Sequence, residues 1–95
     1  MSTATKITEF VDRTKKLSSN TGLASGISGS TNTGSIMVEL YNSAALLHKA
    51  NAENKLDEQL EEVVSALHVA QAMSVIGYTD LEELMDLLEE IKKEK

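Results

Sequence analysis

The chain has 95 residues, no cysteine and a formal net charge of −6 at pH 7. This length suits one domain with a modest core, and the absence of cysteine excludes a disulfide framework or a thiolate metal site. Its apolar runs are shorter than the roughly 20 residues of a membrane span, and the N-terminus lacks a signal-peptide layout, so we expect a soluble, cytoplasmic protein.

Charge is unevenly distributed along the chain. Residues 1–35 hold four basic and two acidic residues, whereas residues 53–95 hold four basic and twelve acidic residues. Because an acidic surface repels phosphate groups, we expect neither nucleic acid nor a membrane surface as a partner.

The N-terminal region predicts an amphipathic helix followed by a linker. Apolar residues Ile7, Phe10 and Val11 recur at helical spacing within residues 1–17. Residues 18–35 are almost entirely Ser, Thr, Asn and Gly, which bury too little apolar area to offset the entropy of ordering, so a flexible linker is predicted. The alternatives are a helix whose glycines allow close approach of another backbone, or a phosphate-binding loop.

Residues 36–50 predict a second helix, with apolar side chains around most of its circumference. A short polar turn at 51–54 follows, and so brief a connection favours an antiparallel helix as the next element.

A third helix is predicted from about Lys55 to Ile76. Its apolar residues first follow coiled-coil spacing and then spread around the helix, which is typical of a buried helix. Gly77 fits the left-handed position that ends many helices, and Thr79 fits the start of a capping box for the last helix. That helix carries one apolar stripe, formed by Leu81, Leu84, Met85, Leu88 and Ile91.

These elements predict an all-α fold, a small bundle of about four helices with a flexible Gly/Ser/Thr/Asn-rich segment between the first and second helices. The chain divides into an N-terminal helix (1–17), the linker (18–35) and a helical-hairpin body with a closing amphipathic helix (36–95), all within a single domain.

The second and third predicted helices hold more apolar surface than one small bundle can cover. We therefore expect a homo-oligomer, a dimer or larger, because association would remove that surface from water. The residues expected at the association face are Val64, Leu67, Val69, Met73 and Ile76.

No pattern in the sequence identifies a catalytic residue, a cofactor site or a metal site. His48 and His68 lie outside any metal-ligand spacing, although burial of His68 among apolar neighbours would lower its pKa. Runs of acidic residues are usually solvated faces, and the last helix offers one to a protein partner. The residues of this possible acidic partner surface are Glu82, Glu83, Asp86, Glu89 and Glu90.

Residues 36–95 show a helix, a short turn, an acidic and then apolar helix, a Gly turn and an acidic amphipathic helix. This order resembles the all-α nucleoside triphosphate pyrophosphohydrolases of the MazG type. The resemblance implies magnesium binding through an ExxE pair and an ExxD pair on successive helices. The matching positions are Glu39 with Asn42 and Glu62 with Ser65, so each pair has one carboxylate here.

The sequence therefore predicts a non-enzymatic helical module for protein–protein interaction, which self-associates and presents an acidic surface to a protein partner. Two alternatives remain open. One is a small structural subunit of an assembly or coat, and the other is an all-α bundle that binds a nucleotide or another anion, resembling a degenerate MazG-type enzyme.

Overall fold

The computed structural model describes residues 2–20 and 31–94, which form four helices. These are α1 (Thr3–Asn20), α2 (Thr31–Ala52), α3 (Leu56–Ala72) and α4 (Tyr78–Glu94). No strand occurs within the described ranges, so the predicted all-α bundle of about four helices is confirmed.

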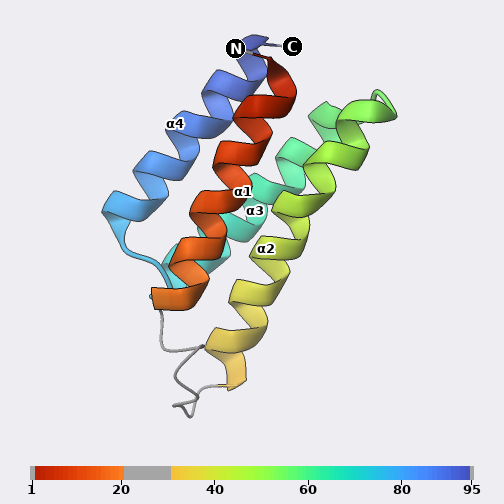
Figure 1. Cartoon of the computed structure of the whole chain (residues 1–95). Coiled ribbons are helices and arrows are strands. Elements are labelled where there is room, and N and C mark those ends of the chain that lie inside the picture. Colours follow the sequence, from red (N-terminus) through yellow and green to blue (C-terminus); the bar gives the residue numbers. More distant parts are fainter. Residues whose placement is uncertain (1, 21–30, 95) are drawn as a thin grey trace.

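The helices form a closed ring in which each one packs against two others. Helix α1 contacts α2 and α4, and α3 contacts the same two helices from the opposite side. Consecutive helices run in opposite directions, so the start of α1 and the end of α4 lie at the same end of the bundle (Figure 1).

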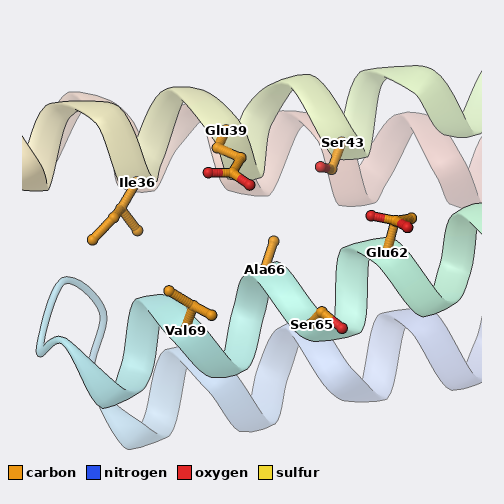
Figure 2. A pocket seen from close by; sticks show the side chains of 7 residues that line it. All are labelled: Ile36, Glu39, Ser43, Glu62, Ser65, Ala66 and Val69. Carbon is orange, nitrogen blue, oxygen red and sulfur yellow. The ribbon is translucent and has the colours of Figure 1, made fainter.

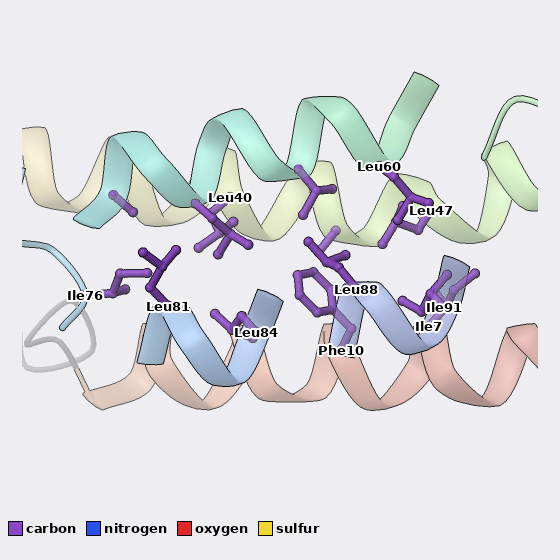
Figure 3. Close-up of a cluster of buried hydrophobic side chains, with 14 of the residues drawn as sticks. Ile7, Phe10, Leu40, Leu47, Leu60, Ile76, Leu81, Leu84, Leu88 and Ile91 are labelled. Carbon is purple, nitrogen blue, oxygen red and sulfur yellow. The ribbon is translucent and has the colours of Figure 1, made fainter. Parts of the chain in front are cut away.

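All four helices contribute to one hydrophobic core. Each helix turns one stripe of apolar side chains inward at a spacing of three and four residues, as expected for an amphipathic helix. Figure 3 shows the side chains of the four helices meeting along the bundle axis. The fully or almost fully buried residues include Ile7, Phe10, Met37, Leu40, Ala44, Leu47, Leu56, Leu60, Val63, Leu67, Ala70, Ile76, Leu81, Leu84, Leu88 and Ile91.

Helix α1 belongs to this core as fully as the other helices do, since Ile7 and Phe10 have no exposed surface. Thr14 is also fully buried, and its hydroxyl donates a hydrogen bond to the Val11 carbonyl at 2.8 Å. That bond removes the penalty of burying an unpaired hydroxyl. The N-terminal helix is therefore part of the bundle, and its side chains help to form the core.

Both helices that flank the predicted linker are longer than the sequence pattern indicated. Helix α1 continues to Asn20 and α2 begins at Thr31, so both ends of the 18–35 segment are helical. Ser, Asn and Gly lower helix propensity by at most about 1 kcal/mol per residue, which a helix anchored by buried side chains can tolerate. The linker prediction otherwise concerns residues 21–30, which lie outside the described residues.

Helices α2 and α3 end in the same way. A left-handed residue follows each helix, Asn54 with φ 60° and Ser74 with φ 61°. The next amide, of Lys55 or Val75, donates to a carbonyl five residues earlier at 2.8 Å. This is the Schellman motif, which satisfies carbonyls left over at a helix end.

The prediction that Gly77 ends the third helix was therefore wrong, because Ser74 takes the left-handed position and α3 ends at Ala72. Gly77 instead precedes α4, and its amide donates to the Asp80 carboxylate at 3.3 Å. The helix begins at Tyr78, so Thr79 lies inside it and is not its cap.

Replacing Ser74 with glycine should stabilise the protein. A non-glycine residue in the left-handed region costs about 1–2 kcal/mol, and glycine adopts it without a Cβ clash. We expect Ser74→Gly to raise the free energy of unfolding by about 1 kcal/mol, which corresponds to roughly 4–8 °C in Tm for a domain of this size.

The matched control is Ser65→Gly, the same change at an exposed helical position of α3. It should lower stability by about 0.5 kcal/mol, because glycine is the poorer helix former. A lower Tm for Ser74→Gly, measured by thermal circular dichroism, would contradict the left-handed assignment.

Candidate interaction surfaces

The structure separates the five residues predicted for an association face. Leu67 and Ile76 lie in the core, and Val64 is partly buried against it, because α2 and α4 cover α3 from both sides. The prediction was wrong for Leu67 and Ile76, which are unavailable to a second molecule. Val69 and Met73 are 51% and 57% exposed.

Three other large hydrophobic side chains are exposed within the described part of the chain. Val38 and Leu46 on α2 are each 49% exposed, and Tyr78 at the start of α4 is 69% exposed. The sequence does not distinguish Val38 and Leu46 from their apolar neighbours, because α2 is apolar on several faces. Val38 and Leu46 are exposed because they lie on the side of α2 opposite the buried Met37 and Leu40. Which side of α2 faces the core is seen only in the packed bundle.

The four helices differ sharply in charge. Helix α2 holds one acidic and one basic residue, Glu39 and Lys49. Helix α1 holds four basic and two acidic residues, α3 holds four acidic and no Lys or Arg residues, and α4 holds seven acidic and two basic residues. The outer surface of α2 is therefore nearly uncharged, whereas those of α4 and of the first half of α3 are acidic.

Two ion pairs join the basic helix α1 to the acidic helix α4. Lys6 lies 3.3 Å from Glu90, and Arg13 pairs with Glu83. The partners are seven residues apart on both helices, so the two pairs fit one antiparallel register. Pairs as exposed as Arg13–Glu83 contribute about 0–1 kcal/mol, so we assign them a larger role in register than in stability.

These pairs change the predicted acidic partner surface. Glu83 and Glu90 form ion pairs with Arg13 and Lys6 of the same chain, so a protein partner would have to compete with these cations. Glu82, Asp86 and Glu89 are exposed, with Glu89 3.8 Å from Lys92 of the same helix. Only the part formed by these last three residues faces solvent without an ion pair to α1.

A small groove of about 100 Å³ lies between α2 and α3 (Figure 2). Glu39 and Ser43 line it from α2, and Glu62 and Ser65 line it from α3. Apolar surface completes the lining, contributed by Ile36, Ala66 and Val69. The antiparallel helices thus bring both carboxylates named in the pyrophosphohydrolase resemblance to one groove.

The residues of this groove do not form a full magnesium site. Mg²⁺ prefers six oxygen ligands and is usually held by carboxylates together with substrate phosphates. Asn42 and Ser65 stand where the resemblance requires carboxylates, and no cluster of three or more His, Cys, Asp or Glu residues suited to a metal occurs in the described ranges.

A wider groove of about 590 Å³ lies between α3 and α4. Its floor includes Leu60 and Val64, and Asp57 and Glu61 stand on its α3 side. Lys92 lines it from α4, so this groove carries charges of both signs.

One histidine lies on α2 and the other on α3. His48 is exposed, and its Nε2 atom lies 3.3 Å from the Thr8 hydroxyl of α1. His68 is exposed on α3. The burial considered for His68 is therefore wrong.

Comparisons with protein-family models, with curated proteins and with solved structures found no match to the chain. None of the four described helices combines the length and hydropathy that crossing a membrane requires.

The ion pair between Lys6 and Glu90 should be detectable by charge exchange. Lys6→Glu or Glu90→Lys alone places like charges together and should lower the free energy of unfolding by about 0.5–1 kcal/mol. The double exchange restores opposite charges and should recover most of that loss.

Urea unfolding at low salt measures all four proteins of this cycle. Because salt screens exposed charges, the coupling should shrink at high salt. Losses that simply add in the double variant would show that the two side chains do not interact.

Proposed function

We propose that the chain is a non-enzymatic helical interaction module, which self-associates and presents an acidic surface to a protein partner. The observation that carries the proposal is the exposure of large apolar side chains outside a core that is already closed. Three of the five in the described part of the chain lie on the adjacent helices α2 and α3, namely Val38, Leu46 and Val69, and a fourth, Met73, directly follows α3.

The size of the apolar effect supports a reversible association. Full burial of one such side chain contributes about 1.5–3 kcal/mol, and each of these is already about half buried. The remaining gain, counted over two copies, is of the same order as the entropic cost of joining two molecules. A weak, concentration-dependent dimer follows from this balance.

The acidic surface supports a second, different contact. Glu82, Asp86 and Glu89 are exposed on α4, and Glu58 and Glu61 are exposed on α3. Identical acidic faces repel each other, so this surface suits a basic partner better than a second copy of the chain. The contacts of the basic helix α1 with α4 give an example of such pairing within the molecule.

Light scattering from low micromolar to near millimolar concentration tests self-association. We expect the mass to rise reversibly from monomer to dimer. A variant with lysine at positions 38, 46, 69 and 73 should stay monomeric and helical, because those side chains lie outside the core. Tyr78→Lys is the control, since it changes an exposed hydrophobic residue elsewhere.

A wild-type chain that stays monomeric at every concentration would reject self-association. Growth beyond the dimer would instead favour a structural subunit of an assembly or coat.

The groove between α2 and α3 supports a second candidate function, binding of a nucleotide or another anion with Mg²⁺. The observation in its favour is that Glu39 and Glu62 line one groove together with two serine hydroxyls. With only two carboxylates there, the interaction module remains the better supported function.

A thermal-shift assay with nucleoside triphosphates and Mg²⁺ distinguishes the two functions. Ligand at 100 times its Kd stabilises a folded protein by about 2.7 kcal/mol, which is a large Tm shift for a chain of this size. We expect no shift. A shift that is lost in Glu39→Gln and Glu62→Gln would establish the ligand site instead.

A further inference from the structure

We infer that two copies associate through the outer face of α2, antiparallel to each other, around a two-fold axis at Asn42. We call this surface the α2 face, and it consists of Val38, Asn42, Ala45, Leu46 and Lys49. The inference rests on the proposed self-association and adds where it occurs and in which orientation.

The α2 face is a continuous stripe on the side of the helix opposite the core. Met37, Leu40, Ala44 and Leu47 point inward and are fully buried. The residues of the α2 face are all exposed and recur every three or four positions, which keeps them on one side of a helix. Four of its five members are uncharged, which is unusual for the outward side of a helix in an acidic protein.

Charge disfavours α4 and the first half of α3 as a contact between identical copies, and it leaves the α2 face available. In a two-fold interface the same patch occurs on both sides, so a patch of one charge sign meets its own sign. The outer surface of α4 and the first half of α3, where all four acidic residues of that helix lie, are acidic, and each copy has a net charge of −6. On α2 the single acidic and the single basic residue balance, so two copies can approach there with little repulsion. The second half of α3, which also lacks Asp, Glu, Lys and Arg, lies beside this face.

The spacing of the α2 face fits an antiparallel pair. Val38 and Leu46 are equally exposed, and each lies four residues from Asn42. A second copy in antiparallel orientation therefore places Val38 opposite Leu46 at two equivalent positions. The two Asn42 side chains meet at the axis, where an amide can both donate and accept a hydrogen bond.

The same alignment keeps like charges apart. Lys49 lies seven residues from Asn42 and falls opposite Ser35 of the second copy. Glu39 falls opposite Ala45, so neither charged residue of α2 meets its own kind. Val69 lines the groove beside Ile36 and flanks this contact from α3.

Single lysine variants test the position of the interface by light scattering. Leu46→Lys should raise the dimer dissociation constant about tenfold or more, because each dimer loses two apolar contacts and gains two buried charges. Tyr78→Lys should leave the constant unchanged. Both side chains lie outside the core, so helicity and Tm should remain those of the wild type.

Cysteine crosslinking tests the orientation. The chain has no cysteine, so Asn42→Cys introduces a single thiol. At a two-fold axis the two thiols come within disulfide reach, and mild oxidation should give a covalent dimer. Ser65→Cys, on the outer side of α3, should give none under the same conditions.

The outcomes separate this inference from the proposed function. A dimer that withstands Leu46→Lys but dissociates in Val69→Lys, or that crosslinks through Ser65→Cys and not Asn42→Cys, would overturn the α2 face and leave self-association standing. A wild-type chain that is monomeric throughout would overturn both.

Discussion

The fold depends on burying the apolar stripe of each helix against two neighbouring helices, and α1 completes this burial. Helices α2, α3 and α4 alone would form an open layer, with the inner faces of α2 and α4 in contact with water. Ile7 and Phe10 fill that opening and are themselves fully buried. The ion pairs Lys6–Glu90 and Arg13–Glu83 match one antiparallel register of α1 against α4. Leu67 of α3, and Ile76 in the connection between α3 and α4, are buried in the same closed core.

Much of the fold could be predicted from residue spacing, because an amphipathic helix has a strong period. Leu56, Leu60, Val63, Leu67 and Ala70 followed a seam pattern in the sequence, and all five lie in the core. The residues at which helices end were harder to predict, since several residue types can adopt the left-handed conformation. Glycine is the usual residue there, but the chain places Ser74 in that position and uses Gly77 at the start of α4.

The candidate surfaces were less predictable, because exposure depends on which helices are neighbours. Spacing alone does not tell whether an apolar residue such as Leu67 or Val69 faces another helix or water. The distribution of charge was easier to predict, since the acidic residues of α3 and α4 can be counted in the sequence. The pairing of Glu83 and Glu90 with α1 required the packed structure. The shared groove of Glu39 and Glu62 follows from the antiparallel hairpin that the short turn favoured.

The meeting of the start of α1 and the end of α4 at one end of the bundle has a consequence for the order of the helices (Figure 1). In a closed ring of four antiparallel helices, the contacts in the hydrophobic core do not depend on which helix comes first in the sequence. Circular permutation is therefore compatible with this architecture. A short peptide could connect α4 to α1 while new termini open between α2 and α3, and the same side chains would remain in contact.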